Sequence, residues 1–448
     1  MQPPTTATNE KLDVLVVGGG FAGLSAAQQL TAAGRSVAVL EARSRSGGRS
    51  HSHQLADGRT IDLGAQLIGD VQTRVSALVD EIGLTRVAPH AEGDVLFVPS
   101  PGAPSRRLGS DRDALGVLGL VDLLQAGVRS GAKMRKLATA AVGSLDGVTA
   151  AEYLRRLTFG GSAYEFLVTT IEDNMCVPLE EISAHEALEA VATAGGLEGI
   201  AASEDWFLAE GTQPIADHLA SQLAAPVVHN APVEQLDVAD DSVVAVAGET
   251  TYRARHAVVA VPPQLYGTVG LTDLVDGARR RAIARWVPAD VVKTVLVFDR
   301  PFWRTNGLSG VFRTPGGFAN STMDCSPADA SAGVLVLFST SSTARRLQHA
   351  PDEEKRMALA VAWLRELLGE DVPSPVSGRS IDWSGEPWSV GGYFSHRGIG
   401  GWRSAPGLFT PVGPVHFAGT ETADEWRGFM EGALQSGERA AAEILATS

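Results

Sequence analysis

Residues 12–49 read LDVLVVGGGFAGLSAAQQLTAAGRSVAVLEARSRSGGR, and this stretch decides the fold. Leu12–Val17 is a short apolar run, which predicts a strand buried on both faces. Apolar residues then recur at helical spacing up to Gly34, a residue type that commonly follows the end of a helix. A second apolar run, Val37–Leu40, completes a strand–helix–strand unit. The order of these elements predicts an α/β domain of the Rossmann type.

A glycine triplet and an acidic residue within this unit predict a dinucleotide site. Gly18 permits a tight turn, Gly20 lets the backbone approach a pyrophosphate, and Gly23 lets the helix pack closely on the sheet. The N-terminus of the helix offers free N–H groups to the anion. Glu41 ends the second strand, where it can accept hydrogen bonds from both ribose hydroxyls and would repel a 2′-phosphate. The complete unit favours a dinucleotide, and at this point NAD and FAD are both open.

Length, charge and cysteine content limit the class of protein. The 448 residues exceed one typical core, so two or three domains are expected. The net charge of −15 argues against a nucleic-acid partner. Cys176 and Cys325 are far apart in sequence, form no disulfide framework and suit a reducing compartment. Residues 1–11 lack the apolar segment of a secretory signal, and no uncharged run reaches the roughly 18 residues of a membrane span. We therefore expect a cytoplasmic protein without a membrane partner.

The rest of the chain predicts a helical region inserted before the first domain is complete. A hairpin turned at Asp57-Gly58 is followed by a helical stripe that Gly83 stops. From residue 111 to about residue 208 the pattern is mostly helical. Three capping boxes, each with a glutamate three residues further on, predict helix starts at Thr149, Ser162 and Ser183.

Strand-like runs dominate the second half of the chain. A short helix is predicted at residues 213–223 and a long amphipathic helix at 352–368. The chain closes with a strand at 415–418 and a helix at 428–445. Further strands are predicted at residues 227–228, 233–238, 243–247, 257–261, Val291–Phe298 and 333–339.

Three further motifs carry a family resemblance. They are Arg43 with Gly47-Gly48-Arg49, the segment PVGPVHFAGTETADEWRGFMEGALQSGERAA at residues 411–441, and VVKT at 291–294 followed by PFWR at 301–304. Together they resemble the flavin-containing amine oxidase family and look closest to its monoamine oxidase branch, in a soluble bacterial form. The resemblance runs over nearly the whole chain and implies that the dinucleotide is FAD.

The resemblance implies a discontinuous Rossmann-type (GR2-like) FAD-binding domain together with a mixed α+β substrate domain. We expect the FAD-binding domain to comprise residues 1–85, 209–285 and 391–448. The substrate domain would comprise residues 86–208, which carry the helical insertion, and residues 286–390.

Physical chemistry supports several FAD contacts. Gly419 allows close backbone approach, Glu421 can bond the polar linker of the cofactor, and Arg49 could neutralise the pyrophosphate. The helix after residue 428 points its positive end at the ring edge, where negative charge develops on reduction. By resemblance, Val233 contributes main-chain contacts on the adenine side. The full expected set is Gly18, Gly20, Phe21, Ala22, Gly23, Glu41, Ala42, Arg43, Gly48, Arg49, Gly64, Ala65, Val233, Gly419, Glu421 and Met430.

Lys293 is the strongest single candidate for a functional residue. Strand alternation puts it on one face with three valines. A lysine on a buried strand is costly unless it is paired, so such lysines tend to be functional, although a lysine at a strand end can instead extend to water. In the family, the lysine at this position holds a water against the flavin N5, which implies an effect on reoxidation by O2.

One departure from the family pattern concerns cofactor attachment. Monoamine oxidases attach FAD through a cysteine in a segment that resembles residues 388–393, WSVGGY. Gly392 stands at the corresponding position. Because glycine has no thiol, we expect the FAD to be non-covalent.

The substrate pocket is also expected from the resemblance. The family places two aromatic side chains before the flavin, and Tyr393 matches one of them. Phe429 stands where the second is usually tyrosine, so it keeps a π face without the hydroxyl. The resemblance further assigns Asn174, Cys176 and Gln66 to the pocket. For Asn174, a structural role at the end of a helix is an equally good interpretation. For Cys176, the alternative is that it only forms part of the cavity wall.

The implied activity is that of an FAD-dependent amine oxidase acting on CH–NH or CH–NH2 donors. Lys293, Tyr393 and Phe429 are the expected catalytic residues, and no metal is expected. The amine becomes an imine that water hydrolyses to a carbonyl, and O2 becomes H2O2. We expect an aromatic or heterocyclic amine as the substrate and a homodimer as the assembly.

Several alternatives stay open. The substrate could be a polyamine or an L-amino acid. An L-amino acid needs an arginine aimed at its carboxylate, and Arg397 and Arg427 are the two candidates, neither of them compelling. A carotenoid or porphyrinogen desaturase shares the fold but would normally show an apolar membrane-docking surface. A dehydrogenase would use an acceptor other than O2. A catalytically silent flavoprotein acting as a binding partner is disfavoured by the intact Lys293 and Tyr393.

Overall fold

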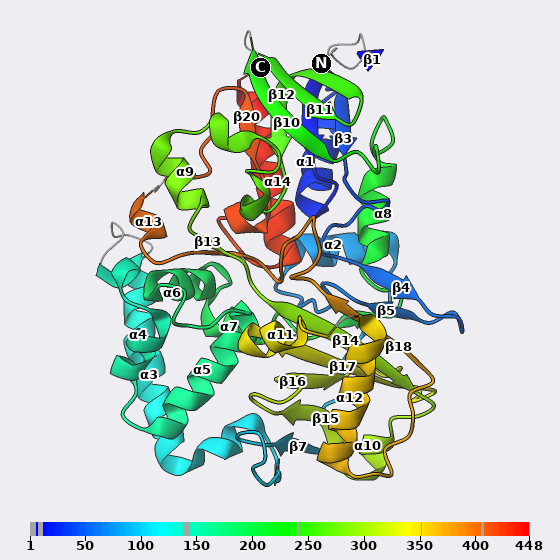
Figure 1. Cartoon of the computed structure of the whole chain (residues 1–448), viewed down its shortest axis with the longest axis vertical. Coiled ribbons are helices and arrows are strands. Elements are labelled where there is room, and N and C mark those ends of the chain that lie inside the picture. Colours follow the sequence, from blue (N-terminus) through cyan, green and yellow to red (C-terminus); the bar gives the residue numbers. More distant parts are fainter. Residues whose placement is uncertain are drawn as a thin grey trace.

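The computed structural model describes residues 6–7, 12–137, 144–239, 242–350, 352–404 and 407–447. Most of the N-terminal stretch considered for a secretory signal lies outside these ranges. Two large sheets lie one above the other, with a group of helices beside the lower sheet (Figure 1). The two chain ends lie together at the top of the upper sheet.

The upper sheet is the predicted nucleotide-binding element. Its central strands β2 (Leu12–Val17), β3 (Val37–Leu40), β12 (Thr250–Val259) and β20 (Val415–Phe417) run parallel. The first half of β12 also pairs antiparallel with a hairpin strand, β11. The remaining strands of this sheet are β1 (Thr6–Ala7), β10 (Val233–Ala239) and β11 (Ser242–Ala247). Strands from three separate parts of the sequence thus meet in one sheet, while the exact domain boundaries stay a prediction.

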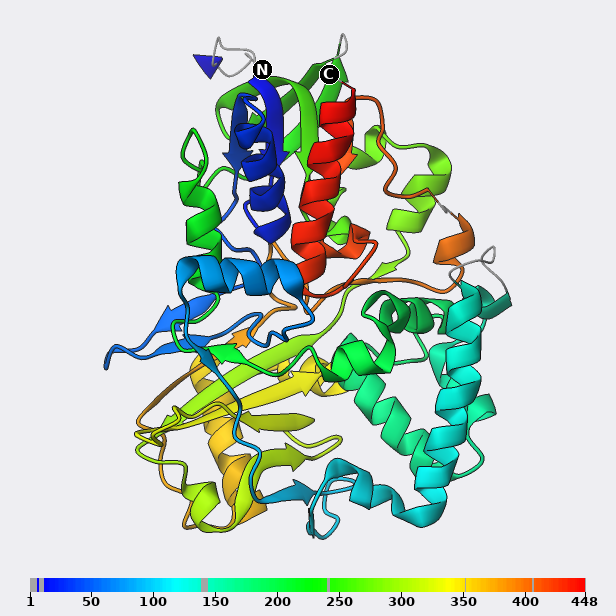
Figure 2. The same ribbon diagram turned by 180° about the vertical axis from the view of Figure 1, so that it is seen from behind.

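Two helices cover one face of this sheet at very close range. Helices α1 (Phe21–Ala32) and α14 (Met430–Ala446) lie side by side, blue and red in Figure 2. A Cβ atom on Gly437 would lie 2.3 Å from the carbonyl oxygen of Ala22, and one on Gly23 would lie 1.9 Å from that of Gly18. The two glycines therefore set how closely the helices and the nucleotide turn can approach.

Side-chain alternation along the strands fills both faces of the sheet. Val14 and Val16 pack with α1 and α14, whereas Leu15 and Val17 pack on the opposite face beside Phe417. All four side chains are at most 3% exposed. This period of two is what the run LDVLVV predicted for a strand covered on both sides.

The lower sheet carries the candidate lysine. Its strands, in spatial order, are β18 (Ser377–Asp382), β14 (Val291–Phe298), β17 (Gly333–Thr340), β16 (Ser321–Asp324), β15 (Leu308–Arg313), β7 (Asp94–Phe97) and β8 (Arg106–Leu108). Helix α12 (Glu353–Leu368) packs on this sheet through Ala360 and Leu364. All eight residues of β14 are buried, so Lys293 has no path along the strand to water.

The helical insertion contains α3 (Gly116–Leu137), α4 (Ala150–Leu157), α5 (Gly161–Met175), α6 (Ala184–Thr193) and α7 (Gly196–Ala201). The capping boxes at Thr149 and Ser183 are confirmed, because each hydroxyl accepts the expected backbone N–H. The one at Ser162 is wrong, since the N-cap of α5 is Gly160, two residues earlier in the chain. The carboxylate of Asp122 accepts the N–H groups of Phe159 and Gly160, each at 2.8 Å. A residue distant in the sequence therefore bonds the backbone just before α5, as a local capping side chain otherwise would.

Shorter elements complete the described fold. The hairpin around Asp57-Gly58 is confirmed as β4 (Ser52–Gln54) with β5 (Thr60–Asp62). The strand predicted at residues 227–228 is only an isolated bridge. Among the described helices, none is both long and apolar enough to cross a membrane. The other elements are α2 (Thr73–Ile82), β6 (Arg86–Val87), β9 (Phe207–Leu208), α8 (Gln213–Ser221), α9 (Gly277–Ile283), β13 (Trp286–Val287), α10 (Phe302–Thr305), α11 (Ser341–Leu347), β19 (His396–Arg397) and α13 (Gly401–Ser404).

Candidate active site

One large cavity joins the turn after β2 to the lower sheet and the helical insertion. Its volume is about 890 Å³, within the range of ligand sites in proteins. Gly23, Cys176 and Glu421 do not line it. The sequence-predicted residues that do line it are Gly18, Gly20, Phe21, Ala22, Glu41, Ala42, Arg43, Gly48, Arg49, Gly64, Ala65, Gln66, Asn174, Val233, Lys293, Tyr393, Gly419, Phe429 and Met430.

The upper end of the cavity has the features of a dinucleotide cradle. Gly18 has a φ of +105°, which a side chain would strain. Glu41 is 4% exposed, and its carboxylate accepts the N–H of Gly19 at 2.7 Å and that of Arg43 at 2.8 Å. Helices α1 and α14 both begin at the cavity without a side-chain cap. Two open helix N-termini suit the pyrophosphate and the electron-accepting ring of a flavin dinucleotide.

Arg49 and Glu421 form a bidentate ion pair beside this cradle. The two N–O distances are 2.6 and 2.9 Å, and the Glu421 side chain is fully buried. Burial raises the pKa of Glu421, but Arg49 lowers it further, and the net result is a pKa below the ordinary value. Arg49 also donates to the carbonyl oxygen of Tyr393 at 2.9 Å. The protein itself thus supplies a partner for each charge, and the predicted cofactor contacts of both residues stay predictions.

Arg43 anchors the chain segment that leads to Tyr393. Its guanidinium donates to the Ser389 hydroxyl at 2.8 Å and contacts Glu386 at 3.3 Å. Gln264 donates to the carbonyl oxygen of Ser389 from the other side. A Cβ atom on Gly392 would lie 3.1 Å from Val291, so the loop passes close to β14 where Gly392 stands. The segment is therefore fixed to both sheets.

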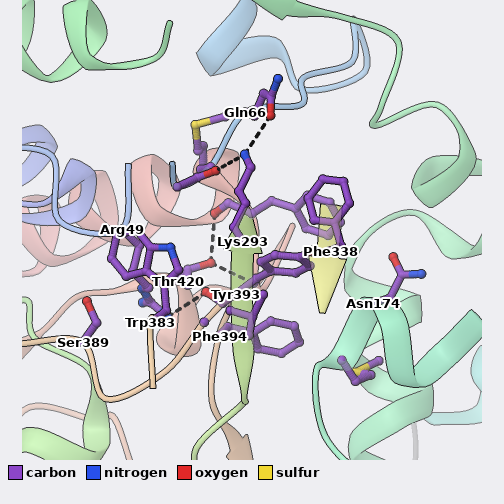
Figure 3. Close-up of a pocket in the computed structure, with 18 of the residues that line it drawn as sticks. Arg49, Gln66, Asn174, Lys293, Phe338, Trp383, Ser389, Tyr393, Phe394 and Thr420 are labelled. Carbon is purple, nitrogen blue, oxygen red and sulfur yellow. Dashed lines mark hydrogen bonds between the residues drawn. The ribbon is translucent and has the colours of Figure 1, made fainter. Parts of the chain in front are cut away.

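Lys293 is buried in the cavity wall with neutral acceptors. Its Nζ donates to the carbonyl oxygen of Gly64 at 2.9 Å and to Oε1 of Gln66 at 2.7 Å, as Figure 3 shows. Burial lowers the pKa of Lys293 to about 8, and the nearby Asp62 carboxylate opposes this shift. Nζ also lies 5.6 Å from the ring centre of Phe338. The cavity therefore contains a proton donor that titrates close to neutral pH.

Tyr393 and Phe429 reach the same cavity from two different segments. Tyr393 exposes 38% of its surface, and it does so within the cavity wall. Burial among protein atoms raises the pKa of its phenol well above the usual value, so the ring is neutral. Gly428 has a φ of +95°, and a Cβ atom there would lie 2.5 Å from the Phe394 ring, so glycine is needed just before Phe429.

Of the two pocket candidates at the end of α5, Asn174 lines the cavity (Figure 3) and Cys176 does not. The side-chain amide of Asn174 donates to the carbonyl oxygen of Thr170 at 2.9 Å. The prediction that Cys176 lines the pocket is wrong. Its φ of +54° ends the helix, and its side chain packs behind the wall against Val291 and Trp383. Burial also raises the pKa of the Cys176 thiol, which makes it an unreactive core residue.

The geometry agrees with what is known of similar proteins. Residues 21–445 match the family described as flavin containing amine oxidoreductase. The chain belongs to this family. Membership establishes a flavin-dependent oxidoreductase acting on amine donors, and it confirms the predicted family and enzyme class.

Individual relatives of this amine oxidoreductase match over nearly its whole length. Putrescine oxidase from Kocuria rosea is 32% identical over 456 residues, which cover 97% of this chain and 95% of that enzyme. Flavin-containing amine oxidase B from Sus scrofa is 29% identical over 462 residues, covering 98% and 86%. The solved structure of wild-type putrescine oxidase bound to putrescine has a TM-score of 0.88 at 27% identity, over 98% of this chain and all of that one. This match confirms the predicted α/β fold.

Some cavity residues of the amine oxidoreductase were not predicted from the sequence. Phe338 pairs with Lys293 across β17 and β14, and the strand predicted at 333–339 could have indicated it. Glu204 lies in a loop after α7 and lines the cavity, and no local sequence pattern indicates that position. Glu204 is solvent-exposed; the protein atoms that surround it in the cavity raise the pKa of its carboxyl, although Arg313 opposes the shift. Within the described ranges, no three His, Cys, Asp or Glu side chains gather as metal ligands would.

Proposed function

We propose that this amine oxidoreductase is an amine oxidase that binds FAD non-covalently, oxidises an aromatic or heterocyclic amine and uses O2 as the electron acceptor. The observation that carries the proposal is the single cavity that connects the glycine cradle with Lys293, Tyr393 and Phe429. The products would be H2O2 and an imine, which water hydrolyses to a carbonyl compound.

The cofactor would be held by residues at the upper end of the cavity. The turn after β2, the N-terminus of α1 and Glu41 fit the adenosine and pyrophosphate, and Gly419 with the N-terminus of α14 fits the ring. When bound, FAD supplies the redox chemistry, taking hydrogen from the α-carbon of the amine and passing electrons to O2. Gly392 offers no thiol for a covalent link.

The residues of the chain would bind the amine and hold a proton. Tyr393 and Phe429 present π faces that favour an amine nitrogen by stacking and cation–π attraction. The phenol of Tyr393 stays neutral, so it adds no charge to the pocket. Lys293 holds its proton at Nζ in the wall, where its charge would stabilise negative charge that develops on reduced oxygen.

The contacts of the arginines argue against an L-amino acid substrate. Arg427 lines the cavity, but its guanidinium is 2.8 Å from Glu186 and 2.5 Å from Glu189. Arg397 lies over the Trp402 ring at 3.9 Å and does not line the cavity. Arg427 is therefore already paired with two carboxylates, and Arg397 lies outside the cavity wall.

A diamine is the second candidate substrate. Glu204 and Tyr393 both line the cavity. Burial is the main reason that the pKa of the Tyr393 phenol is raised, and the Glu204 charge adds to it. A carboxylate there could pair with a second ammonium group. Putrescine oxidase among the relatives makes this candidate worth a direct test.

Anaerobic bleaching of the flavin by a small amine panel tests the proposal. The panel contains an aromatic monoamine, a cyclic heterocyclic amine, a diamine and an L-amino acid. We expect bleaching by one of the first two and recovery of the colour, with H2O2, when air is admitted. Bleaching by the diamine alone, abolished in Glu204→Gln, would support the second candidate.

The other outcomes contradict the proposal in distinct ways. Bleaching without rapid recovery in air would identify a dehydrogenase with another acceptor. A flavin that no amine bleaches would mean a different substrate class or a silent flavoprotein.

A further inference from the structure

The carboxylate of Glu186 lies outside the cavity, yet it contacts both chain segments that carry the aromatic pair. Glu186 is in the first turn of α6, is fully buried and does not line the cavity. Tyr393 lies after the loop anchored by Arg43, and Phe429 precedes α14. These two segments belong to the C-terminal part of the chain, whereas α6 belongs to the helical insertion.

The contact on the Phe429 side is an ion pair. Arg427, two residues before Phe429, donates from Nη1 to Oε1 of Glu186 at 2.8 Å. Its Nη2 also donates to the main-chain oxygen of Glu186 at 3.3 Å. The Arg427 side chain is only 2% exposed, so this pair is shielded from solvent.

The contact on the Tyr393 side passes through His396. Nδ1 of His396, three residues after Tyr393, lies 3.3 Å from the same Oε1 of Glu186. Its Nε2 lies 2.8 Å from the carbonyl oxygen of Met175, which is the last residue of α5 and lines the cavity. Trp402 donates to the second oxygen of Glu186 at 2.8 Å. One carboxylate thus joins three walls of the pocket.

The surroundings keep Glu186 ionised. Burial by itself would raise its pKa, but Arg427 and His396 hold the pKa of this carboxyl well below its usual range. The Ser183 hydroxyl accepts the N–H of Glu186, and the position in the first turn of α6 favours a negative charge. A buried charge with several directed donors fixes geometry more strictly than apolar packing does.

We infer that Glu186 is a positioning residue that sets the distance and orientation between Tyr393 and Phe429, and so the affinity for the amine. The inference rests on the proposed function, in which these two rings hold the substrate. Glu186 does not touch the cofactor cradle or Lys293, so its effect should be confined to the amine step.

Glu189 supplies a matched control. It lies one turn further along α6, has the same side chain and contacts Nη2 of Arg427 at 2.5 Å. Burial raises the pKa of Glu189, although Arg427 opposes the shift. The structure gives Glu189 no bond to His396 or Trp402 among the described residues. Glu186→Gln and Glu189→Gln therefore each remove a carboxyl group from beside Arg427, but only the first loosens the link to the Tyr393 segment.

The experiment compares the flavin-containing wild type with these two variants. Anaerobic stopped-flow reduction by the amine found in the panel gives its Kd, and admission of O2 gives the reoxidation rate. We expect the amine Kd to rise about tenfold in Glu186→Gln, the size expected when one cation–π or stacking contact is lost, and less than about threefold in Glu189→Gln. Flavin content and the rate of reoxidation should match the wild type in both.

Three results would overturn the inference. The first is an amine Kd in Glu186→Gln equal to that of Glu189→Gln. The second is an equal loss of amine affinity and reoxidation rate, which would indicate general damage. If Glu186→Gln does not fold, His396→Phe keeps an aromatic ring at this position and removes the Tyr393-side link together with the bond to Met175, while the Glu186–Arg427 pair stays. An unchanged Kd in that variant is the third result. A wild type that no amine reduces instead refutes the proposed function, and the inference with it.

Discussion

Nζ of Lys293 lies 2.7 Å from Oε1 of Gln66, although the two residues are 227 positions apart in the sequence. Both side chains are buried, at 2% and 8% exposure. The second acceptor is the carbonyl oxygen of Gly64. The Asp62 carboxylate is engaged by Ser52 and Thr212, so neutral oxygens hold the ammonium directly. This arrangement keeps a charged donor in the wall that no carboxylate bonds directly, while the nearby Asp62 offsets part of its field.

The first prediction concerns Lys293→Met. Because the ammonium would stabilise negative charge on reduced oxygen, we expect reoxidation by O2 to slow roughly a hundredfold. Reduction by the amine should change by less than about threefold. Stopped-flow measurement of the two half-reactions checks this, with Lys355→Met as the control because Lys355 is exposed on α12. A variant that reoxidises at the wild-type rate would remove Lys293 from the O2 reaction.

The same lysine predicts a pH dependence of stability. Burial lowers the pKa of Lys293 to about 8 from an ordinary value of 10.5, so between these pH values the unfolded chain binds more protons than the folded one. The contribution of this group to stability therefore rises with pH in that window. Relative to Lys293→Met, the wild-type free energy of unfolding should gain about 2 kcal/mol between pH 8 and pH 10. Denaturant unfolding at both pH values measures it, and a flat difference would contradict the burial of a charged lysine.

The aromatic pair gives a prediction about substrate binding. Phe429→Ala removes a π face and should lower kcat/KM for the amine about tenfold, whereas Phe429→Tyr should stay within about threefold. Steady-state kinetics checks both variants. Phe159→Ala is the control, since Phe159 is 82% exposed and does not line the cavity. Equal losses in Phe429→Ala and Phe159→Ala would show that Phe429 acts only through folding.

The Arg49–Glu421 pair gives a prediction about stability and flavin retention. Glu421→Gln leaves the Arg49 charge without its buried partner and should cost about 2–4 kcal/mol of stability. We expect a lower Tm and weaker retention of the flavin, because Arg49 also holds the carbonyl oxygen of Tyr393. Thermal unfolding and flavin content after gel filtration measure the two effects. Glu425→Gln, whose side chain is 66% exposed, should behave as the wild type.

The last prediction concerns cofactor attachment. Gly392 has no thiol, and both cysteines are buried and do not line the cavity. Acid precipitation of the holoenzyme should therefore release all the flavin to the supernatant and leave a colourless pellet. Fluorescence of the pellet after extensive washing would contradict non-covalent binding.

Local sequence determined the nucleotide-binding half of the site. The LDVLVV strand, the glycine triplet, the following helix and Glu41 are all within 30 residues of one another, and each depends on short-range geometry. The burial of Lys293 also followed from its valine neighbours on one strand. The aromatic pair came from the resemblance, since no period in the sequence places Tyr393 and Phe429 in the same cavity.

Tertiary structure alone decided the partners of the charged groups. Glu421 meets Arg49 over 372 positions, and Glu186 meets Arg427 over 241. The start of α5 shows the same limit, because Asp122 from a neighbouring helix, rather than Ser162, satisfies the backbone N–H groups before it. Propensities and short motifs specify where an element forms, since they act within a few residues. The partner of a buried charge depends on which distant elements pack against it, and that information becomes available only when the chain is folded.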